Sequence, residues 1–276
     1  MKELINIAIT PDDNYAHHGL TMLNSLHLNN KKIKFRIHII DNGISLKNKI
    51  KYILFFLRRG IKFKFYKINF NEIKNAPISD HISIAAYSRL FLSSIIPNNI
   101  SKIIYLDCDL IILKEINELF YLEINENYVG AIREIVSKET LERLEITNSN
   151  YFNSGVLIVN LEKWRKDKIE EILIEFVNKY PEKIKFWDQD VLNFCFKKKW
   201  FMVDFKFNAT HFFYSNLFNA SYFDLNETEY SEVANDPSII HFTSHDKPWM
   251  PRCYHPKKEL YHKYLLTFPQ LIFGKI

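Results

Sequence analysis

The amino-acid sequence predicts an α/β fold built on a mixed, mostly parallel central sheet flanked by helices. Strand-length apolar runs alternate with stretches of helical periodicity through residues 4–106. With 47% hydrophobic residues, six Gly and nine Pro among 276 residues, the chain is too apolar to be disordered or fibrous. It contains no internal repeat, low-complexity tract or linker-like shift in composition. We therefore expect a single domain over residues 1–250 and a small helical appendage over residues 251–276.

The first predicted strand spans residues 4–10 and ends at Pro11-Asp12-Asp13-Asn14, a cluster of turn-forming residues. A helix follows over about residues 17–28, where leucines recur at near-helical spacing. β-branched and apolar residues then predict a second strand over residues 33–40. A strand, a helix and a strand in this order are the usual start of a parallel sheet.

The same alternation continues along the chain. The further expected elements are a helix over 45–58, a strand over 62–66, a helix over 84–94, a strand over 102–106, a strand over 156–159 and a helix over 161–180. Ligands of open parallel sheets bind beyond the carboxyl ends of the strands. Polar residues that directly follow the predicted strands are therefore the candidates for a functional site.

The chain is mildly basic, because it has 37 Lys and Arg residues against 32 Asp and Glu residues and a net charge of +5. Twelve of the basic residues and only one acid, Asp41, fall within residues 31–67. This basic segment indicates either a surface that meets an anionic partner or the solvated outer surface of a helix and two strands. Its aromatic residues alternate as strand residues do, so we expect them in the core and expect no nucleic-acid partner.

Cysteine usage and hydropathy favour a protein of the reducing cytoplasm. Cys108, Cys195 and Cys253 are odd in number and far apart, which argues against a disulfide framework and a cysteine-based zinc site. No N-terminal segment has the pattern of a signal peptide, and no apolar run approaches the roughly 18 residues of a membrane span. We therefore expect a cytoplasmic protein whose only contact with a membrane would be peripheral.

The most informative stretch follows the strand predicted over residues 102–106. Asp107 and Asp109 interrupt an apolar run, where uncompensated charges are costly. Side chains two residues apart in an extended chain point to the same side, so both carboxylates can bind one cation. Hard oxygen ligands favour Mg²⁺ or Mn²⁺, which would keep positions for the phosphate oxygens of a diphosphate ester. The alternative interpretation is a pair of acids that caps a turn.

His241 is the candidate for a third metal ligand. It follows an apolar run, as Asp107 does, and its nitrogen favours Mn²⁺ over Mg²⁺. A hydrogen-bonded core histidine is the alternative interpretation. Lys247, on a loop fixed by Pro248, is a candidate to neutralise a departing phosphate, although a single lysine is also a common solvated residue.

Two more segments carry amides and acids suited to binding sugar hydroxyls. Asn153 lies close to Gly155, which permits close backbone approach, although turn chemistry also explains this pattern. Asp188, Gln189 and Asp190 open a predicted helix, where aspartate is a common cap. One of these two acids is therefore expected to be structural.

Six motifs occur in a characteristic order along the chain. They are Asp12-Asp13-Asn14-Tyr15, His81-Ile82-Ser83-Ile84-Ala85-Ala86-Tyr87-Ser88-Arg89, Tyr105-Leu106-Asp107-Cys108-Asp109, Asn153-Ser154-Gly155-Val156-Leu157, Trp187-Asp188-Gln189-Asp190, and His241-Phe242 with Lys247-Pro248-Trp249. In this order they resemble the family 8 retaining glycosyltransferases, and most of all the bacterial lipooligosaccharide galactosyl- and glucosyltransferases. The resemblance extends to about Pro251.

The resemblance implies a Rossmann-like GT-A fold, a UDP-hexose donor (galactose or glucose), Mn²⁺, and transfer with retention to a glycan or glycolipid acceptor. By the family pattern, Asp107, Asp109 and His241 take the metal positions. The other implied residues are Thr10, Asp12, Asn14, Tyr15 and Cys108 for the nucleotide, Arg89, Asn153, Asp188 and Gln189 for the hexose, and Lys247 for the diphosphate. Arg89, Asp188, Gln189 and Lys247 are the implied catalytic residues.

The chain departs from the family pattern at three places. Ser244 stands where Gly is usual beside the diphosphate, Ala85-Ala86 replaces small hydroxylated residues, and Trp187 replaces a polar residue. We therefore expect this chain to discriminate between donor sugars differently from the lipooligosaccharide enzymes.

Retention at the anomeric carbon requires a covalent sugar–enzyme intermediate or attack from the face that UDP leaves. Gln189, at the family's nucleophile position, is a poor nucleophile, which favours same-face attack, and Asp188 is the reserve nucleophile. The alternative function is a catalytically silent nucleotide-sugar-binding protein. That function would be indicated by a broken metal triad or a missing lysine, and the sequence has neither.

The tail over residues 257–268 combines basic and aromatic residues on a predicted amphipathic helix, which suits an anionic membrane. Under this hypothesis the tail brings the enzyme to a lipid-linked acceptor. A terminal helix packed on the domain is the equal alternative. The sequence does not indicate an oligomeric state.

Overall fold

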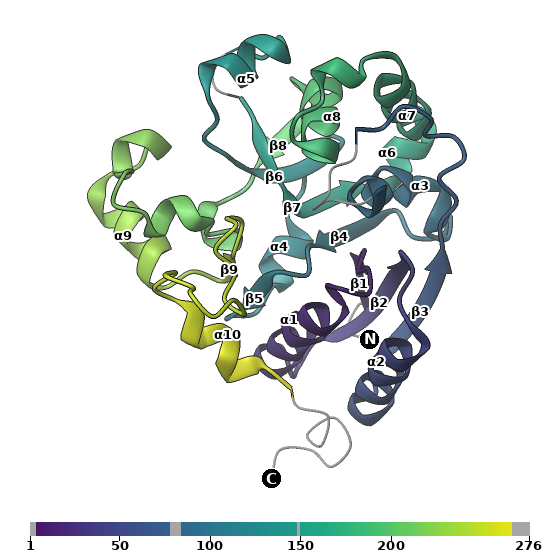
Figure 1. Ribbon diagram of the computed structural model, residues 1–276, viewed down its shortest axis with the longest axis vertical. Helices are drawn as coiled ribbons and strands as arrows, with labels where there is room; N and C mark the ends of the chain where they lie inside the picture. Colours follow the sequence, from purple (N-terminus) through teal and green to yellow (C-terminus); the bar gives the residue numbers. More distant parts are fainter. Residues whose placement is uncertain (1–3, 78–83, 148–149, 267–276) are drawn as a thin grey trace.

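The structure, a computed structural model, describes residues 4–77, 84–147 and 150–266. Within them, the core is a seven-stranded sheet of order β3-β2-β1-β4-β7-β6-β8, with a two-stranded sheet of β5 and β9 beside it (Figure 1). The strands are β1 (Leu4–Ile9), β2 (Lys34–Asp41), β3 (Lys62–Lys67), β4 (Lys102–Leu106), β5 (Leu110–Ile112), β6 (Val129–Arg133), β7 (Phe152–Asn160), β8 (Trp200–Met202) and β9 (Ile239–His241).

Strand direction brings the polar motifs to one edge of the large sheet. β1 pairs in parallel with β2 and β4, and β2 with β3, whereas β7 is antiparallel to β4 and β6. The predicted α/β class with a mixed, mostly parallel sheet is thus confirmed. Because β7 runs against β4, its first residues lie beside the carboxyl end of β4. There the amide of Asp107 donates a 2.8 Å hydrogen bond to the carbonyl of Gly155.

Alternate residues of the central strands pack on opposite faces of the sheet. Ile7 and Ile104 belong to an apolar cluster that includes residues of α1 and α2, whereas Ala8 and Ile103 belong to a second cluster with residues of α7 and α8. Central strands of a parallel sheet are apolar on both faces for this reason. The aromatic residues of the basic segment also pack inward, as predicted, since Phe63 and Phe65 contact the first cluster.

The helices cover both faces of the sheet (Figure 1). The α-helices are α1 (Ala16–Asn29), α2 (Leu46–Arg59), α3 (Leu92–Ile95), α4 (Asn117–Tyr121), α5 (Lys138–Arg143), α6 (Leu161–Lys166), α7 (Ile169–Lys179), α8 (Trp187–Phe196), α9 (Glu227–Asn235) and α10 (Lys258–Tyr264). The 3-10 helices are η1 (Ile84–Phe91), η2 (Pro181–Lys183), η3 (Phe205–Phe207), η4 (His211–Tyr214) and η5 (Ala220–Phe223).

Two predicted helices differ from those observed. The single helix expected over residues 161–180 is wrong, because α6 and α7 are separated at Asp167-Lys168, where Lys168 adopts a left-handed backbone with φ of 53°. The helix expected over residues 84–94 is mostly the 3-10 helix η1, followed by the short α3. Apolar spacing does not distinguish a 3-10 helix from one or two turns of α-helix.

The C-terminal helix α10 packs on the domain. Tyr261 and Tyr264 are buried, the hydroxyl of Tyr261 lies 2.7 Å from Nδ1 of His18, and Asn24 donates to the carbonyl of Tyr264. Of the two interpretations of the tail, these contacts support the packed helix. Residues 267 and 268, where the predicted tail helix ends, lie outside the described residues. None of the described helices combines the length and the apolar composition needed to cross a bilayer.

Candidate active site

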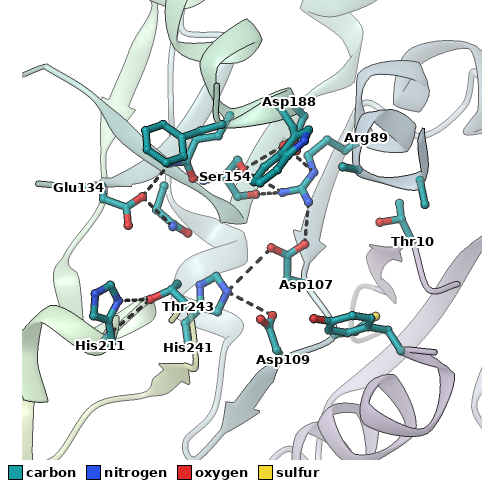
Figure 2. Close-up of a pocket in the computed structure, with 18 of the residues that line it drawn as sticks. Thr10, Arg89, Asp107, Asp109, Glu134, Ser154, Asp188, His211, His241 and Thr243 are labelled. Carbon is teal, nitrogen blue, oxygen red and sulfur yellow. Dashed lines mark hydrogen bonds and ion pairs between the residues drawn. The ribbon is translucent and has the colours of Figure 1, made fainter. Parts of the chain in front are cut away.

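Two strands of the small sheet bring the predicted metal ligands together. Asp107 directly follows β4, Asp109 precedes β5, and His241 ends β9, where it pairs with Leu110. Nε2 of His241 lies 3.2 Å from Oδ1 of Asp109 and 3.9 Å from Oδ2 of Asp107 (Figure 2). One donor atom from each of the three residues lies within 4.8 Å of the others.

The outer oxygen of each carboxylate is held by the protein. Oδ1 of Asp107 accepts hydrogen bonds from the Tyr105 hydroxyl at 2.7 Å and from Arg89 at 2.8 Å. Oδ2 of Asp109 accepts from Nζ of Lys247 at 2.6 Å. Burial would raise the pKa of Asp109, but the charges of Lys247 and His241 more than offset it and hold that pKa below its usual value. Both carboxylates therefore keep their inner oxygens for a further ligand.

The three inner donor atoms fit a divalent cation. Nδ1 of His241 lies 2.9 Å from Oδ1 of Asn208, so the imidazole donates a hydrogen bond there and turns Nε2 toward the two carboxylates. Two carboxylates that face one another repel unless a positive charge lies between them. Gly155 keeps this space open, because a β-carbon there would lie 2.7 Å from Oδ2 of Asp107. Two carboxylate oxygens and one imidazole nitrogen suit Mn²⁺ better than Mg²⁺.

Arg89 joins the candidate metal ligand Asp107 to the predicted sugar side. Its buried guanidinium forms ion pairs with Asp107 at 2.8 Å and with Asp188 at 3.0 Å, and donates to the hydroxyl of Ser154 (Figure 2). It also lies over the ring of Tyr105, 4.4 Å from the ring centroid. Burial raises the pKa of Asp188 to about 6, although Arg89 opposes this shift. The guanidinium is thus held in one position by two acids.

The amides expected to face a sugar share an acid that the sequence did not reveal. Oε2 of Glu134 accepts from Asn153 at 2.8 Å and from Gln189 at 2.9 Å, and burial raises the pKa of Glu134. Gln189 also donates to the Tyr151 hydroxyl and accepts from the amide of Ser154. The signal for Glu134 was present, because it follows the apolar strand β6 as Asp107 follows β4.

Of the two acids that open α8, Asp190 is the structural one. It is completely buried, pairs with Arg143 at 2.9 Å, and accepts from the Tyr151 hydroxyl. It also accepts from the backbone amides of Lys185 and Phe186, just before the helix. Neither acid caps α8 as predicted, since Phe186 occupies the cap position without a side-chain hydrogen bond.

The loop after β1 supplies the predicted nucleotide side. Oδ1 of Asp12 accepts from the amide of Tyr15 at 2.8 Å, and Tyr15 packs edge-on against Trp249. The hydroxyl of Thr10 lies 2.8 Å from that of Tyr105, which connects this loop to Asp107. Burial raises the pKa of Tyr15, so its hydroxyl is neutral. The strand-to-helix turn therefore presents an aromatic face beside the candidate metal site.

These side chains line one cavity of about 460 Å³. The predicted residues that line it are Thr10, Asp12, Tyr15, Arg89, Asp107, Cys108, Asp109, Asn153, Asp188, Gln189, His241 and Lys247. Asn14 is exposed and does not belong to the lining. The first residues of the second motif, His81-Ile82-Ser83, lie outside the described residues.

His211 and Thr243 also line the cavity, and sequence reasoning missed both. Nδ1 of His211 lies 2.6 Å from the hydroxyl of Thr243. Burial lowers the pKa of His211 to about 4, with the charges of His241 and Lys247 contributing. A lone histidine in an irregular, aromatic stretch carries no pattern that marks it as part of a site.

Comparisons with known proteins agree with this geometry. Residues 6–253 match the model of Glycosyl transferase family 8. The chain is 32% identical over 268 residues to General stress protein A of Bacillus subtilis (strain 168). The match covers 95% of this chain and 93% of that protein. It is 28% identical over 259 residues to a lipopolysaccharide 1,2-glucosyltransferase of Escherichia coli, over 90% of this chain and 74% of the relative.

Among solved structures, the fold is similar to that of galactosyltransferase LgtC in complex with donor and acceptor sugar analogs. The two agree with a TM-score of 0.84 at 27% identity, over 99% of this chain and 100% of that one. The predicted GT-A fold and hexosyltransferase class are thereby confirmed. On these matches, the chain belongs to glycosyl transferase family 8.

Proposed function

We propose that this enzyme is a metal-dependent, retaining hexosyltransferase that moves galactose or glucose from a UDP-sugar to a hydroxyl of a glycan or glycolipid. The observation that carries the proposal is the convergence of Asp107, Asp109 and His241 within 4.8 Å, in a cavity that also contains Arg89 and Lys247. The choice of hexose stays open, because one relative is named for glucose and another for galactose.

Asp107, Asp109 and His241 would hold the cation, with Mn²⁺ favoured by the imidazole nitrogen. When bound, such an ion supplies positive charge to a diphosphate and stabilises the charge that develops as UDP departs. Lys247 contributes a second cation at the same place, since its ammonium group lies against Asp109. Fixed charges of this kind are usually the largest contribution to catalysis.

The nucleotide would lie on the loop after β1. We propose that Tyr15 stacks on uracil and that Thr10, Asp12 and Asn14 contribute polar contacts, with Cys108 beside the ribose or phosphate. The half-buried position of Tyr15 and the hydrogen bond that Asp12 makes to its amide support this role, because they orient the ring. Asn14, which is exposed, would contact the nucleotide only through a change in its loop.

The hexose would face Asn153, Asp188, Gln189 and Arg89, with Glu134 as a further acceptor for sugar hydroxyls. Gln189 is a poor candidate for a nucleophile, because both ends of its amide already make hydrogen bonds. Asp188 is buried against Arg89, which also disfavours a covalent intermediate.

These contacts favour attack from the face that UDP leaves. The acceptor oxygen bonds to the anomeric carbon while the bond from that carbon to the phosphate oxygen breaks. The proton of the acceptor hydroxyl passes to the departing phosphate oxygen, so the step balances without a protein base.

The proposal is tested by hydrolysis of a panel of UDP-sugars, which needs no acceptor. We expect turnover of UDP-galactose or UDP-glucose with Mn²⁺, none in EDTA, and recovery when Mn²⁺ is returned. Asp109→Ala should lower turnover at least about 100-fold, and Mn²⁺ should not restore it, because a ligand is lost. Full turnover in metal-free buffer would contradict the metal dependence. Tight UDP-sugar binding with no turnover of any donor, even with acceptor glycans present, would favour the silent binding protein instead.

A further inference from the structure

Helix α2 presents an apolar stripe to solvent. Leu46, Ile50, Ile53 and Leu57 are 74%, 45%, 36% and 67% exposed. Their spacing of four, three and four residues places all of them on one face of the α-helix. Single exposed apolar residues are ordinary on protein surfaces, whereas a contiguous row of them marks an interaction surface.

The fold does not use this stripe. α2 packs on the sheet through a different, aromatic face, where Tyr52, Phe55 and Phe56 are completely buried in the first apolar cluster. A helix in the outer layer of a protein normally has one apolar face and one polar face. α2 has two apolar faces, and the described part of the chain covers only the aromatic one.

Basic side chains flank the stripe. Lys47 and Arg58 are exposed on α2, each directly after a residue of the stripe. The whole segment 31–67 contains twelve basic residues and one acid. The stripe therefore has an exposed basic residue beside each of its two ends.

Two acids beside the start of α2 bind other groups. Asp41 forms an ion pair with Lys49 at 2.5 Å. Asp13 accepts hydrogen bonds from the amide of Ser45 and the side chain of Asn48 at the start of the helix. Neither acid therefore forms an ion pair with Lys47 or Arg58.

We propose that Leu46, Ile50, Ile53 and Leu57 dock this protein on an anionic phospholipid surface. An interfacial helix inserts its apolar side chains at the level of the lipid headgroups, while flanking Lys and Arg residues bind the headgroup phosphates. Charge selects this occupant over a second copy of the chain. A symmetric contact through the stripe would place one basic rim against another, which is unfavourable.

This surface is distinct from the C-terminal tail. Tyr261 and Tyr264 of α10 are buried against the domain, and Leu260 is half-buried against the same apolar cluster. α2 and α10 both pack against α1 and lie toward the same end of the molecule (Figure 1). Membrane contact through α2 would therefore leave the packing of α10 intact.

The test is cosedimentation with vesicles of equal parts phosphatidylglycerol and phosphatidylcholine, and with vesicles of phosphatidylcholine alone. The wild-type protein should bind the anionic vesicles, and binding should weaken as salt is raised. Ile50→Gln combined with Leu57→Gln should bind at least about tenfold more weakly. Leu217→Gln is the matched control, because Leu217 is 80% exposed and lies outside α2. It should bind as the wild type does.

Lys47→Glu combined with Arg58→Glu should also weaken binding to the anionic vesicles. Thermal unfolding should confirm that both double variants remain folded, since all four positions are exposed. UDP-sugar hydrolysis should be unchanged in both, because none of these residues lines the cavity. Vesicle binding therefore tests the docking surface, and UDP-sugar hydrolysis tests the proposed enzymatic function separately.

Three outcomes would overturn the docking surface. One is a wild-type protein that does not bind anionic vesicles, or binds neutral ones equally well. Another is an Ile50→Gln, Leu57→Gln variant that binds as the wild type does. This includes the case in which only Lys257→Glu with Lys263→Glu, at the cap of α10 and within it, removes binding. The third is concentration-dependent dimerisation that the α2 variant abolishes, which would assign the stripe to a second copy of the chain.

Discussion

A β-carbon on residue 155 would clash with Cε1 of His241, so the present position of that imidazole requires glycine at 155. The requirement is steric and does not come from the backbone conformation, because Gly155 does not adopt a left-handed backbone. The space that the missing side chain leaves open is bounded by His241 and Asp107, two of the three candidate metal ligands. A single glycine in β7 thus determines whether these ligands can converge.

We predict that Gly155→Ala displaces His241 and lowers both Mn²⁺ affinity and UDP-sugar hydrolysis at least about 10-fold to 100-fold. Overpacking of the buried strand should also lower the free energy of unfolding by about 1–3 kcal/mol. Isothermal titration with Mn²⁺ and urea unfolding measure the two effects.

Gly130→Ala in β6 is the matched control for Gly155→Ala. A β-carbon at residue 130 would lie 2.9 Å from the side chain of Ile124, away from the cavity lining. It should therefore lower stability without changing Mn²⁺ affinity. Wild-type Mn²⁺ affinity in folded Gly155→Ala would contradict the steric account.

Asn208 should control the metal affinity of His241 without being a ligand. It is buried, lies 2.9 Å from Nδ1 of His241, and donates to Asn153 at 2.8 Å. We predict that Asn208→Leu lowers Mn²⁺ affinity about 10-fold to 100-fold, because the imidazole loses the partner that fixes its tautomer. Asn208→Asp keeps an acceptor for Nδ1, so its loss of Mn²⁺ affinity should be smaller than that of Asn208→Leu. Titration calorimetry measures both affinities.

A buried asparagine elsewhere separates this effect from general destabilisation. Asn30 accepts a hydrogen bond from the amide of Ile116 and does not line the cavity. Asn30→Leu should therefore lower stability and leave Mn²⁺ affinity unchanged. Equal Mn²⁺ affinity in wild type and Asn208→Leu would remove Asn208 from the metal site.

Residues that follow apolar strands were the part of the site that the sequence could predict. Asp107 and His241 stand out because a charge or an imidazole at the end of a buried strand needs a partner. Glu134 follows the same rule after β6 and was still missed, because a single acid directly after Arg133 resembles an ordinary charged strand end. A polar residue directly after a buried strand is therefore a good candidate for a site residue, but sequence alone identifies it only where several such residues cluster.

Other features depend on tertiary contacts that no local pattern contains. Asn208 and His211 flank the segment of Ala209, which forms an isolated parallel bridge with Ile240 of β9, and this long-range bridge brings them to His241 and Thr243. The break between α6 and α7 depends on the left-handed backbone of Lys168, a residue type without a preference for that conformation. The α-helical periodicity of the flanking residues concealed this break.

The ion pair of Asp190 should matter for stability rather than for chemistry. Asp190 is completely buried and is held by Arg143, the Tyr151 hydroxyl and two backbone amides. We predict that Asp190→Ala lowers the free energy of unfolding by about 3–5 kcal/mol, because it leaves Arg143 without its partner. Urea unfolding measures this loss.

An exposed ion pair gives the comparison for Asp190→Ala. Lys163 and Glu126 lie 2.9 Å apart, but the carboxylate of Glu126 is 87% exposed. Glu126→Ala should cost no more than about 1 kcal/mol. If Asp190→Ala unfolds like the wild type but does not hydrolyse UDP-sugars, Asp190 has a role in the reaction instead.

His38 should make the fold sensitive to acid. It is completely buried in β2, with Nε2 3.0 Å from Oδ1 of Asn6 and Nδ1 2.8 Å from the hydroxyl of Tyr66. Burial lowers its pKa to about 4, and the charges of Arg36 and Lys64 add to the shift. Because the unfolded chain binds a proton near pH 6.5 and the folded chain does not, stability is complete above pH 6.5 and falls as the pH drops toward 4.

This linkage predicts that the free energy of unfolding of the wild-type protein falls by about 2 kcal/mol between pH 7.5 and pH 5 because of His38. His38→Gln removes the titrating group. The fall in its free energy of unfolding over the same pH interval should therefore be smaller than that of the wild type by about 2 kcal/mol. His18, His211 and His255 have pKa values lowered in the same direction, but they are present in both proteins and cancel in the comparison. Urea unfolding at the two pH values measures the difference. Parallel losses in the two proteins would mean that His38 accepts its proton without cost to the fold.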